Sequence, residues 1–342
     1  NLNGVDMASR DQANRILLPQ KISQAEAKVQ ALRATFKMNP SEYYRHDRVP
    51  KSKVAVNSEL EWEEKRLADL KAIRSTLEEN EEDRQSDPSI PRRGLVYMDD
   101  SKKDDRVKVA ISTGDVDRAK HVSTILPGMN NVPSEDINDH VKNAELVHKH
   151  AADNAHISQD QVATIAWMYD TPQGGQVVSS KYATKASHEI GSALEGMHAF
   201  RHTNGIERAH TSLLGHSYGS TTAGKVAKLV RKGVLDDLVM YGSPGAGAHD
   251  AREYNLDHGK PYVSGIKSDD AVKGKGTLNS KFGNNPMFMP GVKHLANNSE
   301  RDRSFFIPWK MFDRHSEYLE KGTSSLEDIS RVVTNVPVKG EK

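Results

Sequence analysis

Thr211-Ser212-Leu213-Leu214 leads directly into Gly215-His216-Ser217-Tyr218-Gly219, and Ser220-Thr221-Thr222-Ala223-Gly224 follows. The apolar beginning of this stretch predicts a buried strand, and its small-residue end predicts the start of a helix. The central five residues fit the pattern G-x-S-x-G. Two glycines around a serine permit a sharp turn in which neighbouring backbone comes close and the serine is strained. The pentapeptide is common by chance, so its position between a strand and a helix makes it informative.

Outward from this stretch, short apolar runs alternate with helical patterns of about ten or more residues. This alternation predicts an α/β fold, a mostly parallel central sheet flanked by helices. In such sheets, functional residues gather at the carboxyl ends of the strands. We expect strands at 94–98, 107–111, 122–126, 162–167, 209–214, 235–241 and 261–267, and helices within 132–152 and over 182–200, 218–231 and 324–333.

The first 93 residues have a different pattern. Apolar residues recur at spacings of three and four in 23–37 and 58–77, which predicts two amphipathic helices. The stretch 78–93 is acidic and then contains prolines, which predicts a linker. We therefore divide the chain into a helical N-terminal region with its linker, 1–93, and a catalytic domain, 94–342. The two helices either pack on that domain as a hairpin or form a surface for a protein partner.

Composition limits the classes of protein. Among 342 residues, 36% are hydrophobic and 28% charged, with a net charge of +1, so no strong field favours nucleic acid or anionic lipid. The absence of cysteine excludes disulfides, a cysteine nucleophile and thiolate metal sites. No apolar run approaches the roughly 20 residues that span a bilayer. The chain begins at Asn1 rather than Met, so we expect a processed or trimmed chain, soluble and either cytoplasmic or exported.

Ser217 is the predicted nucleophile of an α/β-hydrolase fold, because that fold places the serine of G-x-S-x-G between a strand and a helix. One oxyanion donor in this fold is the N–H of the next residue, here Tyr218. The other comes from the loop after the third strand, here Pro127-Gly128-Met129-Asn130. We assign that donor to the Met129 N–H, with the Gly128 N–H as the alternative. An ordinary strand-ending turn is the competing interpretation of this loop.

The acid and the base follow the nucleophile in the order serine, acid, histidine. Asp269 and Asp270 come directly after the last predicted strand, and one of them orients the histidine. We prefer Asp270 and keep Asp269 as the alternative. His294 and His315 are the histidines beyond them. We prefer His315 as the base, because it stands just before the last predicted helix.

Two other patterns have weaker interpretations. Residues 219–225 fit G-x-x-x-x-G-K, but Val226 stands where a phosphate-binding loop needs Ser or Thr to hold magnesium. His148, His150 and His156 lack the spacing of a zinc site, and we expect them on the surface. We therefore expect no metal and no cofactor.

Two features beside the predicted site carry further expectations. His216 lies inside the turn, and we expect it to point away from the serine hydroxyl as a packed or hydrogen-bonded neighbour. Residues 277–313 hold several large apolar side chains between the acid and the base. They form either a lid over an acyl pocket or a peripheral packing segment.

Several blocks of the chain resemble, in order, an actinobacterial α/β-hydrolase family catalogued as a domain of unknown function, DUF1023. The resemblance implies a Ser-Asp-His triad, with the acid in 268–272 and the base in 315–318. The family commonly has Asp-Pro-Ile or Asp-Pro-Val at the acid, and Asp270-Ala271-Val272 departs by one residue, so Asp269 stays open. The blocks are Leu2–Val5 with Arg10–Arg15, Leu126–Asn130, Ala163–Asp170, Gly215–Ser220, and Asp236–Val239 with Gly242–Gly245.

Together these residues predict a serine hydrolase, an esterase- or lipase-like enzyme that cleaves an acyl ester through an acyl-enzyme. Its partner is then a small-molecule or lipid-like ester, with no nucleic acid and no transmembrane segment. The alternative belongs to another class: a catalytically idle hydrolase-like scaffold that binds a protein partner through its N-terminal helices. An intact set of serine, histidine and aspartate favours the enzyme.

Overall fold

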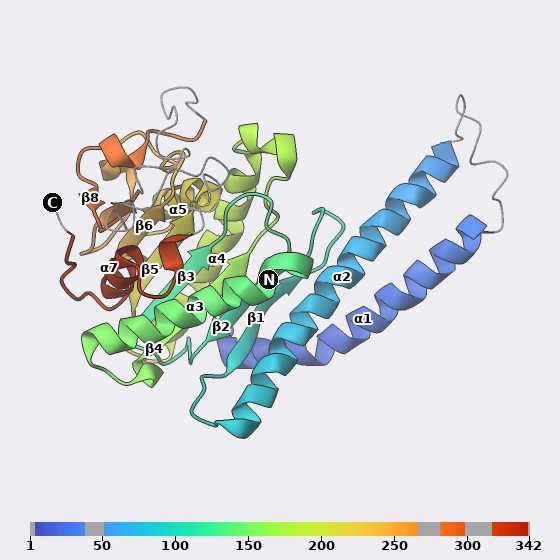
Figure 1. Ribbon diagram of the computed structural model, residues 1–342, viewed down its shortest axis with the longest axis horizontal. Helices are drawn as coiled ribbons and strands as arrows, with labels where there is room; N and C mark the ends of the chain where they lie inside the picture. The colour runs from blue at the N-terminus through green and yellow to red at the C-terminus, as the bar shows by residue number, and fades with distance from the viewer. Residues whose placement is uncertain (1–3, 38–50, 266–280, 298–316, 341–342) are drawn as a thin grey trace, which may run out of the picture.

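The computed structural model describes residues 4–37, 51–265, 281–297 and 317–340. Its described strands form one eight-stranded sheet in the order β1-β2-β4-β3-β5-β6-β7-β8 (Figure 1). The first two strands join the sheet antiparallel, and β4, β3, β5, β6, β7 and β8 run parallel. The strands are β1 (Arg93–Asp99), β2 (Lys108–Thr113), β3 (His121–Leu126), β4 (Val162–Met168), β5 (His210–His216), β6 (Asp237–Tyr241), β7 (Pro261–Ser264) and β8 (Lys293–His294). The mostly parallel sheet confirms the predicted fold class.

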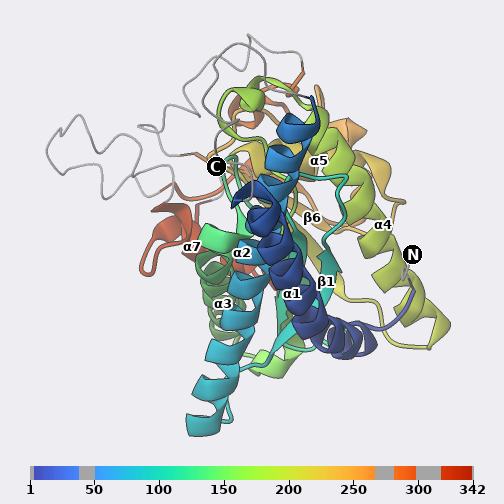
Figure 2. The ribbon, with the colours of Figure 1, turned by 90° about the vertical axis from the view of Figure 1, so that its right-hand side faces the viewer.

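Helices cover both faces of the sheet (Figures 1 and 2). The apolar residues of α1, α2, α3 and α7 form one buried layer with the sheet, and those of α4 and α5 lie mainly in the layer on the opposite face. None of the helices that the structure describes is long and apolar enough to cross a membrane. The helices are α1 (Met7–Lys37), α2 (Lys51–Ser86), α3 (Pro133–Ala155), α4 (Lys181–Thr203), α5 (Tyr218–Leu229) and α7 (Ser324–Val333), with short 3-10 turns η2 (Gln159–Gln161), η3 (Gly174–Val178), η4 (Ala251–Glu253) and η5 (Pro286–Phe288).

Both N-terminal helices are longer than predicted. The predicted helix at 23–37 is the second half of α1, which begins at Met7 and contains Pro19. Its first amides are capped from far along the chain, because the Asp117 carboxylate accepts hydrogen bonds from the N–H groups of Met7 and Ala8 at 2.8 and 3.1 Å. Asp6 adds a local cap, because its carboxylate accepts from the Ser9 N–H at 2.6 Å, so the start of the helix combines a local signal with a distant one.

The predicted linker at 78–93 is wrong for its first part, because α2 continues to Ser86. The last turns of α2 hold the chain that returns into β1. Asn80 is buried, its side-chain amide donates to Pro91 O at 3.1 Å, and its Oδ1 accepts from the Arg93 N–H at 2.8 Å. The acidic residues are therefore on an ordered helix beside the sheet, and the division of the chain at residues 93 and 94 stays a prediction.

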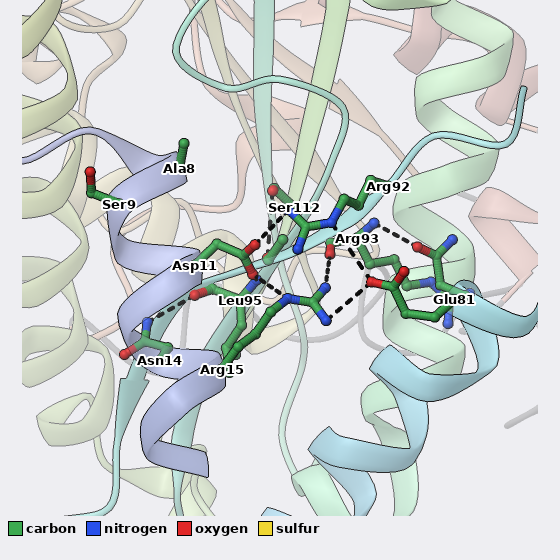
Figure 3. A network of polar contacts seen from close by, with 12 residues as sticks. Ala8, Ser9, Asp11, Asn14, Arg15, Glu81, Arg92, Arg93, Leu95 and Ser112 are labelled. Atoms are coloured by element: carbon green, nitrogen blue, oxygen red, sulfur yellow. Dashed lines mark hydrogen bonds and ion pairs between the residues drawn. The ribbon is translucent and has the colours of Figure 1, made fainter. Parts of the chain in front are cut away.

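The exposed edge of β1 is capped by side chains of α1 (Figure 3). The Asp11 carboxylate accepts from the Leu95 N–H at 2.6 Å, and the Asn14 amide donates to Leu95 O at 2.8 Å. The Arg15 guanidinium donates to Arg93 O at 2.5 Å. An edge strand otherwise leaves its backbone groups unpaired and ready to pair with another chain. The helix therefore takes the place of a further strand and ties the N-terminal region to the sheet.

Three other expectations differ from the structure. The strand expected at 261–267 ends at Ser264 as β7, and residues 266 and 267 lie outside the described residues. No strand was expected beyond 261–267, but His294 belongs to the short edge strand β8. His148, expected on the surface, is only 1% exposed, because it lies on the side of α3 that faces the sheet.

We expect Asp11→Ala to lower the free energy of unfolding by about 1–3 kcal/mol, because it leaves a buried N–H of β1 without an acceptor. Asp11 is buried and also pairs with Arg15 and Arg92 at 2.8 and 2.7 Å. Urea denaturation measures the change. Gln12→Ala, at the neighbouring exposed position of α1, is the matched control. Equal stability of the two variants would contradict the role of Asp11 in capping the edge.

Stability should also fall as the pH falls from about 6.5 to about 4. Burial lowers the pKa of His140 and of His148 from 6.5 to about 4. The unfolded chain therefore binds more protons than the folded chain in this range, and protonation favours unfolding. Replacing one such histidine, as in His148→Leu, should reduce the slope of unfolding free energy against pH by at most about 1.4 kcal/mol per pH unit.

Urea titrations at several pH values measure this slope. His150→Leu, at a partly exposed position of the same helix, controls for the loss of a histidine as such. An unchanged slope in His148→Leu would show that His148 does not account for the acid sensitivity.

Candidate active site

Ser217 occupies a strained turn between β5 and α5. Its φ of 50° and ψ of −124° lie in a region that non-glycine residues rarely adopt, at a cost of about 1–3 kcal/mol. Hydrogen bonds hold it there: its N–H donates to Tyr241 O at 2.9 Å, and its carbonyl accepts from the Ser220 N–H at 2.9 Å and the Ser220 hydroxyl at 2.6 Å. Strain held in this way by its surroundings is typical of a functional residue.

Both glycines of the motif are required by close backbone contacts. A Cβ on Gly215 would lie 2.6 Å from Ser220 Cα. A Cβ on Gly219 would lie 2.4 Å from Pro127 O and 2.6 Å from Leu126 O. The turn therefore brings α5 against the end of β3, from which the predicted oxyanion loop begins.

The predicted oxyanion loop lies directly against the nucleophile. A Cβ on Gly128 would come 3.4 Å from Ser217 Oγ. Among the described residues, no acceptor meets the N–H groups of Gly128 and Met129. The Tyr218 N–H is also available, because the first amides of a helix have no partner within the helix. The structure thus brings the serine hydroxyl together with the loop that carries the second predicted donor, the Met129 N–H, and its alternative, the Gly128 N–H.

The Tyr218 side chain has a structural role. Burial raises the pKa of its phenol to about 12, so the phenol is neutral. Its hydroxyl donates to Ser179 O at 2.6 Å and accepts from the Ala183 N–H at 3.2 Å. These bonds fix the beginning of α4 against the turn. The predicted oxyanion donor of Tyr218 is its backbone N–H and not its side chain.

His216 is a packed neighbour, as expected. Its ring stacks on Tyr241 with centroids 5.2 Å apart, and the ring of Tyr318 lies 6.1 Å away. Tyr318 is buried and stands three residues after His315.

The predicted acid and base themselves, Asp269, Asp270 and His315, lie outside the described residues. β7, the strand before the predicted acid, ends level with the carboxyl end of β6, because Ser264 O accepts from the N–H of Gly242 at 3.1 Å. The rival base is poorly placed. His294 is on β8, three strands from β5, which corresponds to about 14 Å across the sheet.

The competing phosphate-loop pattern at 219–225 lies inside α5, so most of its amides are committed to the helix. Gly224 is needed for packing, because a Cβ there would overlap Ala246 O. No group of three or more histidine or acidic side chains that could hold a metal occurs within the described ranges.

The polar residues behind the predicted oxyanion loop were not predicted from the sequence. Tyr169 donates to Pro127 O at 3.3 Å, and Thr171 donates to Asn131 O at 2.8 Å. Asn130, in the loop itself, has a left-handed φ of 60°. The presence of asparagine at this position was the one local signal for a left-handed backbone, because asparagine tolerates a positive φ better than most residues.

A mostly parallel sheet, a strained serine after β5 and a close loop after β3 define the class: the protein has an α/β-hydrolase fold. The sequence model of a family described as Alpha/beta hydrolase matches residues 102–280. The chain belongs to this α/β-hydrolase family, also known as DUF1023, which confirms the resemblance. The matched range contains Ser217, the oxyanion loop and both candidate acids.

Relatives in mycobacteria support the family. A protein of *Mycobacterium bovis* and one of *Mycobacterium tuberculosis*, both uncharacterised, are 30% identical to this chain over 241 residues, which is 68% of this chain and 84% of each relative. Another uncharacterised *Mycobacterium tuberculosis* protein is 34% identical over 184 residues, 51% of this chain and 26% of its own length.

Solved structures are similar at a low level. A dienelactone hydrolase from *Anabaena variabilis* has 11% identity and a TM-score of 0.36, covering 72% of this chain and 96% of its own. A fungal esterase from *Rhizomucor miehei* has 14% identity and a TM-score of 0.37, covering 75% and 90%.

Gly219→Ala should lower the free energy of unfolding by about 1–3 kcal/mol, the usual cost of overpacking, because the added methyl meets two carbonyls of the β3 end. Gly191→Ala, in α4, is the matched control. Its nearest neighbour would be 3.5 Å away, so it should be neutral or stabilising by up to about 1 kcal/mol. Thermal or urea unfolding compares them, and a Gly219→Ala variant as stable as the native chain would refute the close packing.

Proposed function

We propose that this protein is a serine hydrolase that cleaves an acyl ester through an acyl-enzyme. The observation that carries the proposal is the arrangement at the turn. Ser217 is strained, Gly128 lies beside its hydroxyl, and the N–H groups of Gly128 and Met129 have no acceptor among the described residues. Backbone donors aimed at a developing oxyanion are a large source of rate enhancement in acyl transfer. Membership of an α/β-hydrolase family agrees with this class of reaction.

In the proposed reaction, Ser217 Oγ attacks the ester carbonyl while His315 takes its proton. Asp270, or Asp269, orients His315 and stabilises the imidazolium. The Met129 and Tyr218 N–H groups, with Gly128 as the alternative to Met129, stabilise the negative oxygen. His315 then gives its proton to the departing alcohol, and later activates the water that releases the acid and restores the serine.

The substrate in this proposal is a small-molecule or lipid-like ester. The Met129 side chain beside the oxyanion loop is 40% exposed. Within 277–313, the segment predicted as either a lid or a packing segment, Phe282 lies beside the turn, since its ring meets the Tyr218 ring edge-on at 5.9 Å. Phe288 in the same segment is 83% exposed. Apolar side chains on both segments favour an acyl chain as the group they contact.

Reaction with a fluorophosphonate probe and with short p-nitrophenyl esters tests the proposal. The native chain should react with both, and Ser217→Ala should lose both reactions, because the attacking oxygen is gone. Ser212→Ala is the matched control. It removes another buried serine hydroxyl, five residues earlier in β5, that has no hydrogen-bond partner among the described residues.

The triad assignments are tested with the same assay. His315→Ala should lower kcat by about 10⁴-fold or more. The acid is identified by comparing Asp270→Asn with Asp269→Asn, since the true acid should show the larger loss. A folded native chain that fails to react with the probe and every ester would overturn the enzyme proposal and favour the binding scaffold instead.

A further inference from the structure

The peptide that joins Gly128 to Met129 carries the preferred oxyanion donor, and hydrogen bonds fix the chain just before it. The Tyr169 hydroxyl donates to Pro127 O at 3.3 Å, and the Thr222 hydroxyl donates to the Tyr169 oxygen at 3.0 Å. Tyr169 is buried, so this contact is shielded from water. The carbonyl group of Pro127, which precedes this peptide, is therefore held by buried side chains at the end of β4 and in α5.

The chain just after that peptide is fixed by Asn130. Its N–H donates to Pro172 O at 3.0 Å, and its Oδ1 accepts from the Gly174 N–H at 2.8 Å. The neighbouring Asn131 amide donates to Met129 O at 2.9 Å. The loop after β3 is thus bonded to the loop after β4 through both the backbone and the side chain of one residue.

The peptide between these two anchored points has no partner of its own among the described residues. Because each peptide unit is a rigid plane, anchoring its two neighbours leaves only the dihedrals of Gly128 and Met129 to direct its N–H. A free donor with anchored neighbours is preorganised for an incoming oxygen, and preorganisation is what makes such donors effective.

We propose that Asn130 is a positioning residue of the oxyanion hole: by bonding to Pro172 and Gly174 it holds the Met129 N–H toward Ser217. This inference rests on the proposed serine-hydrolase function. Asparagine meets two requirements at this position. It tolerates the left-handed φ of 60°, and its carbonyl oxygen reaches the Gly174 N–H. Aspartate meets both as well, whereas glycine meets only the first.

The variants Asn130→Gly and Asn130→Asp separate these requirements. Ester hydrolysis should show a kcat about tenfold lower for Asn130→Gly, with KM within about twofold, since a misplaced donor weakens the transition state more than substrate binding. Asn130→Asp keeps the acceptor for Gly174 and should restore kcat to within about threefold of the native value. A purely structural role would lower the melting temperature without this split between kcat and KM.

Asn335→Gly is the matched control. Asn335 also has a left-handed φ, of 55°, but lies in the turn after α7, and its replacement should leave kcat unchanged. The inference is overturned if Asn130→Gly keeps native kcat, or if Asn130→Asp is as slow as Asn130→Gly, while the native chain remains active. A native chain that hydrolyses no ester and does not react with a fluorophosphonate overturns the proposed function, and this inference with it.

Discussion

The site depends on one close contact, the packing of Gly219 against the carbonyls at the end of β3. There is room for no side chain at this point, since a Cβ would lie 2.4 Å from Pro127 O. Because of this contact, the beginning of α5 packs directly against the end of β3, and Gly128 lies beside Ser217 Oγ. Ser217 and Gly128 are 89 residues apart in the chain, and they become neighbours because two backbones touch.

A second set of contacts joins the N-terminal helices to the same sheet. Asp11, Asn14 and Arg15 satisfy backbone groups of β1 that would otherwise be unpaired (Figure 3). Asp117 caps the first turn of α1. Three of these residues belong to the block Arg10–Arg15, by which the chain first resembled its family. The block therefore has a physical role in protecting a sheet edge. An exposed strand edge can pair with another chain, and α1 blocks such pairing at Leu95 and Arg93.

Much of the fold could be predicted because its signals are local. The strand–turn–helix around Ser217 and the helix at 324–333 depend on hydropathy and small residues within a few positions, and the structure places both where the patterns do. Predictions were wrong where a distant group decides the outcome. The first turn of α1 is capped in part by Asp117, the extension of α2 depends on contacts of Asn80 with the chain before β1, and the burial of His148 depends on which side of α3 meets the sheet.

The sequence by itself determined the family, the alternation of strands and helices, and the choice of Ser217, since these depend on residue order and short-range pattern. The positions of Asp269, Asp270 and His315 in chain order are sequence predictions of the same kind, and they lie outside the described residues. Tertiary structure alone decided which backbone amides near Ser217 have no acceptor among the described residues. It also decided which side chains fix the loop that carries these amides. Hydrogen bonds such as Asn130 to Gly174 join separate loops, and their geometry exists only after the strands have packed side by side.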